Sequence, residues 1–259
     1  MPGLPQLLSE AEPLEDGFAV AIAEDWLQGR TAYGGLTSAI ALAAARCVDQ
    51  DLPPLRSGQF AMVAPLAGRV EARSRVLRRG RNATWISVEL SGASGVGFTA
   101  SFVFMRRIES VVALDHYTMP RDLIPVSEAR PVPTERSPAF LRTHFESRFA
   151  LPKAAPGEAD LCWWVRAKAR EGLHPEVECV LVGDALPTAV LPLLDFAVPI
   201  SSMHWHVNMI EPTPSADGWW LIRSTSPYCA QGAASEHIGQ WNSEGSAAMM
   251  GLQSVAVFG

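Results

Sequence analysis

An alanine-rich segment with apolar residues on nearly every face most constrains what this 259-residue chain can fold into. Residues 36–47 read LTSAIALAAARC after Tyr33-Gly34-Gly35 and contain no helix breaker, which predicts a helix of about three turns. A helix that is apolar all round must be covered by other elements. The short runs that follow it are rich in Val, Phe and Trp and are divided by Gly and Pro, so we expect strands at 59–63, 70–77, 83–90 and 96–105.

The second half of the chain repeats this order of elements. Proline-rich residues 108–137 predict a linker, because proline interrupts regular structure. Beyond it we expect a helix over 175–184 and strands at 145–151, 161–168, 202–210, 219–225, 233–241 and 247–257. Two similar units predict an internal duplication with an α+β fold, in which each antiparallel sheet wraps one helix. The predicted domains are residues 1–107 and 138–259, joined by the linker 108–137.

Composition excludes several classes of protein. A net charge of -6 and scattered basic residues argue against a nucleic-acid partner, which needs a basic surface. No apolar run approaches the roughly 18 residues of a membrane span, and residues 1–16 do not resemble a secretory leader. The chain is therefore expected in the cytoplasm. Four widely spaced cysteines predict neither a zinc site nor a disulfide scaffold, and we expect them to be buried small residues: Cys47, Cys162, Cys179 and Cys229.

Several short motifs in this order resemble the type II acyl-CoA thioesterases. In the first half they are Gly34-Gly35 opening the helix, residues 64–68 (APLAG), residues 78–81 (RRGR) and residues 100–102 (ASF). In the second half they are residues 182–187 (VGDALP), the strand 202–212, residues 219–222 (WWLI) and residues 251–253 (GLQ). The resemblance covers most of the chain apart from its first ~15 residues and the linker. It implies a double hotdog fold of two tandem repeats.

The resemblance also implies a hydrolytic site. The family places an Asp after the second-half helix, a Thr or Ser at the start of the next strand, and a Gln in the last strand. These fall on Asp184, Ser202 and Gln253. Two departures are noted: Ser replaces the more usual Thr with Ser201 beside it, so the assignment has two candidates, and Glu211 stands where relatives often have a basic residue.

Asp184 is unusual on physical grounds as well. Val177, Val180 and Leu181 form an apolar stripe on the predicted helix, and Asp184 continues it. Burial of a carboxylate raises its pKa and requires hydrogen-bond partners. Such a group could activate water, although an Asp that only ends the helix before Pro187 fits the same pattern.

The other candidates each have a structural alternative. Ser202 and Gln253 could orient the water, or could be polar residues at a strand edge and on a solvent-facing strand. Gly34 and Gly35 are candidates to bind substrate through helix N-terminal N–H groups, or could serve only to open the helix. The first helix lacks Asp and Glu, so we expect one active site per chain.

The resulting prediction is a cytoplasmic acyl-CoA thioesterase of lipid metabolism, a homo-oligomer by resemblance, that uses no metal or redox cofactor. Five Trp residues are candidates to line the acyl tunnel or to pack the core: Trp163, Trp164, Trp205, Trp219 and Trp220. His204 and His206 share one side of a strand, but no third metal ligand is evident nearby. The alternatives are a non-hydrolytic acyl-CoA-binding protein and an enoyl-CoA hydratase-like hotdog; the latter is disfavoured because no His follows Asp184 at short spacing.

Overall fold

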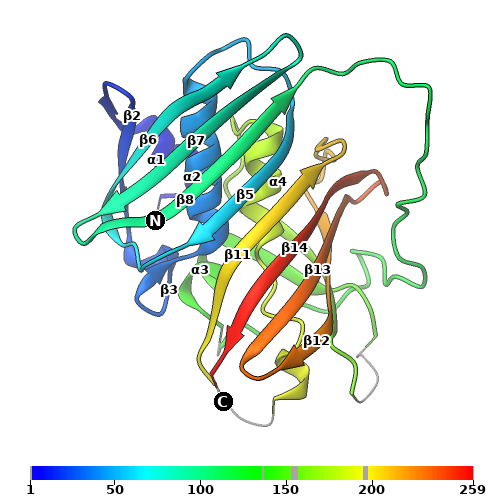
Figure 1. Cartoon of the computed structure of the whole chain (residues 1–259). Coiled ribbons are helices and arrows are strands. Elements are labelled where there is room, and N and C mark those ends of the chain that lie inside the picture. The colour runs from blue at the N-terminus through cyan, green and yellow to red at the C-terminus, as the bar shows by residue number, and fades with distance from the viewer. Residues whose placement is uncertain (1, 136, 153–156, 195–197, 259) are drawn as a thin grey trace.

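A computed structural model describes residues 2–135, 137–152, 157–194 and 198–258 of the chain. Within these residues, one sheet of twelve strands curls around two helices (Figure 1). The strand order across the sheet is β1-β2-β6-β7-β8-β5-β11-β14-β13-β12-β10-β9. The first six strands of this order come from the N-terminal half of the chain and the last six from the C-terminal half.

The N-terminal half contains the predicted long helix and all four of its predicted strands. The helix predicted from the alanine-rich run is α2 (Gly34–Cys47). The predicted strands are β5 (Leu55–Met62), β6 (Gly68–Arg79), β7 (Ala83–Gly92) and β8 (Gly95–Met105). Several short elements were not predicted: α1 (Leu4–Ser9), β1 (Glu12–Leu14), β2 (Gly17–Ile22), the 3-10 turn η1 (Glu24–Trp26), and the small hairpin of β3 (Leu27–Gln28) and β4 (Thr31–Ala32).

The C-terminal half has the same order around a shorter helix, α4 (Pro175–Gly183). Its strands are β9 (Phe145–Phe149), β10 (Asp160–Ala167), β11 (Ile200–Met209), β12 (Trp220–Ala230), β13 (Ala233–Asn242) and β14 (Ala247–Val257). The helix α3 (Ala139–His144) and the 3-10 turn η2 (Leu191–Leu193) were not predicted.

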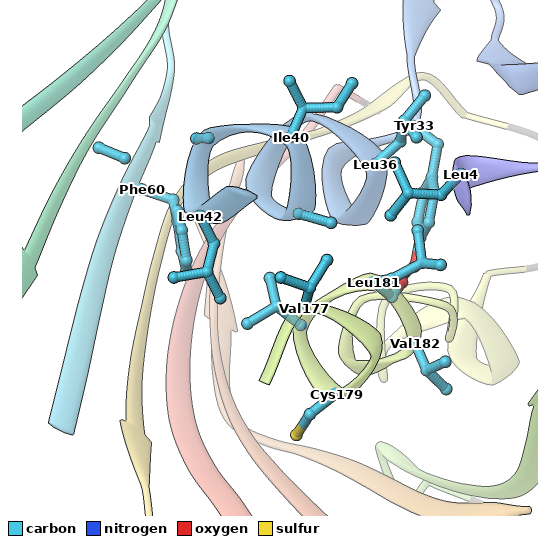
Figure 2. Close-up of a cluster of buried hydrophobic side chains, with 14 of the residues drawn as sticks. Leu4, Tyr33, Leu36, Ile40, Leu42, Phe60, Val177, Cys179, Leu181 and Val182 are labelled. Carbon is cyan, nitrogen blue, oxygen red and sulfur yellow. The ribbon is translucent and has the colours of Figure 1, made fainter. Parts of the chain in front are cut away.

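The two helices pack against each other inside the curled sheet (Figure 2). Leu36, Ile40 and Leu42 of α2 are completely buried, and so are Val180 and Val182 of α4. The alanines of α2 are buried as well, and their small side chains let the sheet and the second helix approach closely. The expected covering of an all-apolar helix is therefore observed.

The halves join through β5 and β11, which pair antiparallel at the centre of the sheet. Phe60 of β5 lies opposite Trp205 of β11, and both side chains are buried. The centroids of the two rings lie 5.2 Å apart. The single sheet therefore keeps the second-half site residues in a fixed position relative to the first-half helix.

The proline-rich segment leaves the end of β8 as a long loop (Figure 1). Its described residues include one isolated β-bridge, between Pro131 and Arg148, and no helix or strand. Its later part packs on the outer face of the second-half sheet, where Ala129 is buried and Tyr117 stacks on Trp241. This part of the segment is thus a cover for one sheet face as well as a connection.

No helix among the described residues is long and apolar enough to cross a membrane.

Candidate functional site

Three polar side chains from different elements of the second half meet at one point. The Nε2 atom of Gln253 donates hydrogen bonds to Oδ1 of Asp184 at 2.8 Å and to Oγ of Ser202 at 3.1 Å. The structure therefore brings together the Asp, Ser and Gln that the sequence analysis named. Gln253 is the central member, because its amide contacts both of the others.

The local folding of each element explains this meeting. Asp184 is the C-cap of α4, directly after the last helical residue, so its carboxyl group leaves the helix end toward the sheet. Gln253 is buried and lies on the inner face of β14. The pairing of β11 with β14 shifts between Ser202 and His204, a β-bulge that gives Ser202 and Trp205 inward positions on the same strand.

The bulge also distinguishes the two adjacent serines. Ser201 is exposed, and among the described residues its hydroxyl donates a hydrogen bond to the carbonyl of Ser202, at 3.4 Å. Ser202 is half-buried and accepts the Gln253 amide hydrogen bond. Of the two candidates, Ser202 is the one that contacts Gln253.

The start of α2 lies against the end of α4 beside this group. The backbone N–H of Gly35 is close enough to the Asp184 carboxylate to stabilise its negative charge. A Cβ atom at Gly34 would stand 2.6 Å from Oδ2 of Asp184, and one at Gly35 would stand 2.6 Å from the Leu181 carbonyl oxygen. Gly35 therefore allows the backbones of the two helix ends to approach closely, whereas a side chain at residue 34 would press on the Asp184 carboxylate.

The surroundings of Asp184 make its proton affinity unusually high. Burial is the main cause, and it raises the pKa of Asp184 to about 7. The charge of Glu236 adds to this rise, whereas the hydrogen bond from Gln253 and the nearby backbone N–H of Gly35 oppose it. An acid with a pKa close to neutrality can both accept and return a proton near physiological pH.

A small cavity of about 10 Å³, with room for about one water molecule, lies beside Asp184 and Gln253. It is lined by Gly183, Asp184, Leu186, Pro187, Ile222, Ser224, Glu236, Ile238 and Gln253. Apart from the acidic and amide side chains and Ser224, its walls are apolar. Glu236 was not predicted as a site residue. Burial alternates along β13, and Glu236 lies between the inward-facing Ala234 and Ile238, so this alternation could have indicated that it faces inward.

The Trp residues named from the sequence divide between two faces of the sheet. Trp163, Trp205 and Trp220 belong to the main core, and Trp220 donates a hydrogen bond to Glu178 at 3.0 Å. Trp164 and Trp219 pack on the outer face beneath the proline-rich segment. None of the five borders the cavity beside Asp184 in the described part of the chain.

The cysteines differ in part from their prediction. Cys162 and Cys179 are buried as expected, but Cys47 and Cys229 are exposed. Cys47 is the last residue of α2 and Cys229 lies near the outer end of β12, where the sheet no longer covers them.

Three other features named from the sequence lie outside this site. Glu211 forms an exposed ion pair with Arg107 at 2.5 Å. His204 faces outward on β11 and is exposed, and among the described residues no three His, Cys, Asp or Glu side chains form a group that could hold a metal ion. The basic turn at residues 78–81 connects β6 to β7, and Arg79 there pairs with Asp49.

Solved structures resemble this chain along nearly its whole length. A conserved protein of unknown function with a hot dog fold from Alicyclobacillus acidocaldarius superimposes with a TM-score of 0.86 at 16% identity, covering 100% of this chain and 99% of the other. The acyl-CoA thioesterase II TesB2 from Mycobacterium marinum gives 0.78 at 16% identity, covering 98% of each chain. The tesB protein of Mycobacterium avium subs. paratuberculosis gives 0.75 at 20% identity, covering 99% of each. These similarities confirm the double hotdog fold.

Two family models match this chain. A search of curated proteins gave no significant match. The model of the acyl-CoA thioesterase N-terminal domain matches residues 22–105, and the model of the C-terminal domain matches residues 120–257. The second match alone spans more than half of the chain, so this protein belongs to the acyl-CoA thioesterase family.

Proposed function

We propose that the chain hydrolyses the thioester of an acyl-CoA to a free acid and CoA, with a water molecule that Asp184 activates. The observation that carries the proposal is the Gln253 amide, which donates hydrogen bonds to both Asp184 and Ser202. Family membership supports thioester chemistry, and the raised pKa of Asp184 suits a group that must take up and release a proton.

The reaction needs one proton transfer in each direction. The Asp184 carboxylate accepts a proton from water while the water oxygen bonds to the thioester carbon. The tetrahedral intermediate then breaks its carbon–sulfur bond, and Asp184 returns the proton to the departing sulfur. The products are the free acid and the CoA thiol, and the carboxylate is restored.

The neighbouring groups have separate tasks in this proposal. Gln253 holds the carboxylate, and the Ser202 hydroxyl helps to orient the attacking water. The N–H of Gly35 faces the Asp184 charge and is assigned to stabilising the base. Gly34 begins α2, where N–H groups lack intrahelical partners, and its N–H is assigned to the carbonyl oxygen that becomes negative in the intermediate.

A thiol-release assay on acyl-CoAs of graded chain length tests the proposal. Asp184→Asn removes the base and keeps the shape, so turnover should fall at least ~100-fold, which is the lower range for loss of a general base. Ser201→Ala is the matched control, because this exposed serine does not contact Asp184 or Gln253 in the described hydrogen bonds. Equal rates for wild type and Asp184→Asn would contradict the role of Asp184. Tight binding of acyl-CoA without thiol release would favour a non-hydrolytic binding protein instead.

A further inference from the structure

Glu236 is a second buried carboxylate close to Asp184. Its side chain is 1% exposed, and it lies on β13 directly opposite Gln253 of β14. Residues opposite each other on antiparallel strands have Cα atoms about 5 Å apart. Gln253 also donates its hydrogen bond to Asp184, so both carboxylates are neighbours of the same amide side chain.

Three hydrogen bonds hold the Glu236 carboxylate in one orientation. Its Oε1 atom accepts from the Thr188 hydroxyl and, at 3.1 Å, from the N–H of Ala189. Its Oε2 atom accepts from the Ser224 hydroxyl at 2.9 Å. Thr188 and Ala189 lie shortly after Asp184 in the chain, so these bonds also attach the segment that follows Asp184 to β13.

No cation balances the two carboxylates within the described residues. None of the ion pairs formed there includes Asp184 or Glu236. A carboxylate oxygen can accept two hydrogen bonds, and the described contacts supply one to Oε2 of Glu236. A small donor that reaches both carboxylates would therefore stabilise the pair, because buried charges need hydrogen-bond partners.

The cavity that these groups line fits such a donor. Asp184, Glu236, Gln253 and Ser224 all border it, and its volume is about 10 Å³. A buried water molecule needs roughly 10–15 Å³ and two to four polar partners. Water has two O–H groups, so one molecule can donate a hydrogen bond to each carboxylate. The space is too small to admit a thioester as well, so this water is distinct from the one that attacks the substrate.

We infer that the cavity holds one ordered water molecule that donates hydrogen bonds to both Asp184 and Glu236, and that Glu236 is a positioning residue for Asp184. Glu236 fixes the water, and the water holds the Asp184 carboxylate from the side of the cavity. The role given to Glu236 rests on the proposed function, since it treats Asp184 as the base. The water site itself does not depend on that function.

The other groups that face Asp184 are neutral near pH 7. Tyr33 precedes α2, and burial raises its pKa well above the usual value, so its hydroxyl stays protonated. β14 and β11 contribute Gln253 and Ser202, which do not titrate in this range. Burial raises the pKa of Glu236, and its three hydrogen bonds oppose this rise. Among the described residues, Glu236 is therefore the charged side chain that acts on Asp184.

A high-resolution crystal structure of the wild type tests the water site directly. We expect density for one water molecule within about 3.2 Å of an oxygen atom of both carboxylates. An empty cavity, or a water that contacts only one of the two, would overturn the inference. This measurement needs no variant, so it decides the inference even if substitution of Glu236 prevents folding.

The role of Glu236 is tested by the pH profile of kcat/KM, which a residue with only a structural role would not shift. Glu236→Gln keeps the size and an oxygen acceptor but removes the charge, so ionisation of Asp184 becomes easier. The apparent pKa should fall by ~1 unit or more, as for loss of one like charge within ~6 Å. Glu178→Gln is the matched control, because Glu178 is equally buried but contacts Trp220 and does not line the cavity. An unchanged profile for Glu236→Gln, or an equal shift for Glu178→Gln, would overturn the role of Glu236.

These outcomes are distinct from failure of the proposed function. Absence of hydrolysis with every acyl-CoA, or full activity of Asp184→Asn, would contradict the proposed function and with it the role of Glu236. Hydrolysis that depends on Asp184 but has the same pH profile in Glu236→Gln would contradict the inference alone.

Discussion

Asp184 ends a helix and also contacts the other proposed site residues. It is the C-cap of α4, and its carboxylate accepts a hydrogen bond from Gln253. The C-terminus of α4 therefore positions the Asp184 side chain at the proposed site. A single residue provides both the end of the helix and the proposed base.

Ser202 and Ser201 offer a matched pair for testing the site at this scale. Ser202→Ala removes the hydroxyl that the Gln253 amide contacts at 3.1 Å, so we expect kcat to fall roughly 10- to 100-fold through poorer orientation of the water. Ser201→Ala removes an exposed hydroxyl and should leave kcat unchanged. Steady-state thiol release measures both variants. The opposite pattern, with loss at Ser201 alone, would show that the strand register in solution differs from the one described here.

The residues of the site differ in how visible they are in the sequence. Asp184 could be found because it continues an apolar stripe, and the resemblance indicated Gln253 and Ser202. The choice between Ser201 and Ser202 could not be made, because the bulge after Ser202 changes the alternation of the strand and has no clear sequence signal. Glu236 was missed because a single Glu within a strand usually faces solvent.

At the scale of elements, the contact between the start of α2 and the end of α4 assembles the site. Tyr33 precedes α2, and its hydroxyl donates to the Leu181 carbonyl of α4 at 2.8 Å. Burial, with the nearby charge of Asp184, raises the pKa of Tyr33 well above its usual value, so the hydroxyl stays protonated as a donor. Phe140 stacks on the ring with centroids 4.1 Å apart and completes the junction.

Substitutions of the two glycines at this junction should have different effects, one on stability and the other on activity. An Ala at residue 35 would place its Cβ 2.4 Å from the Tyr33 hydroxyl and 2.6 Å from the Leu181 carbonyl oxygen. We therefore expect Gly35→Ala to lower the free energy of unfolding by about 2–4 kcal/mol through overpacking and a weakened buried hydrogen bond. Gly34→Ala meets only the ends of the Asp184 and Met62 side chains, so it should displace the base and lower kcat.

Urea unfolding and thiol release, measured on the same preparations, separate these effects. Gly34→Ala should stay within about 1 kcal/mol of wild-type stability, because Ala is tolerated in helices. Equal stability for Gly35→Ala and the wild type would show that the helix junction is looser than the structure indicates.

Across the whole molecule, the two halves share a fold, but the two junctions between their helices carry different side chains. The other ends of the two helices also meet, and there Glu176 near the start of α4 accepts hydrogen bonds from Arg46 of α2 at 2.7 Å and from the N–H of Leu55 at 2.7 Å. Glu176 is 4% exposed. An ion pair occupies the position that corresponds to the Asp184 site, which agrees with the expectation of one active site per chain.

Much of this architecture could be predicted from the sequence, and the remainder has physical reasons. The helix at 34–47 and the strands divided by Gly and Pro were found because alanine runs and breakers act locally. The N-terminal strands β1 and β2 were missed because Glu12, Pro13 and Asp16 are not typical of strands. The pairing of β2 with β6 joins residues that are distant in sequence, so no local pattern indicates it. The packing of the proline-rich segment was missed for the same reason: its partners, such as Trp241, are distant in sequence.

The proposal of one active site per chain predicts a simple dependence of activity on pH. The pKa of Asp184 is about 7, and only its ionised form can accept a proton from water. Activity should therefore rise as pH increases through this value and become constant above it.

The most direct test of the account is the pH profile of kcat/KM for wild-type thiol release between about pH 5 and pH 9, corrected for spontaneous thioester hydrolysis. We expect a single ionisation with an apparent pKa of about 7, with the acidic side inactive, and loss of this step in the residual activity of Asp184→Asn. A wild-type profile that is flat over this range, or one that Asp184→Asn retains unchanged, would contradict the assignment of Asp184 as the base.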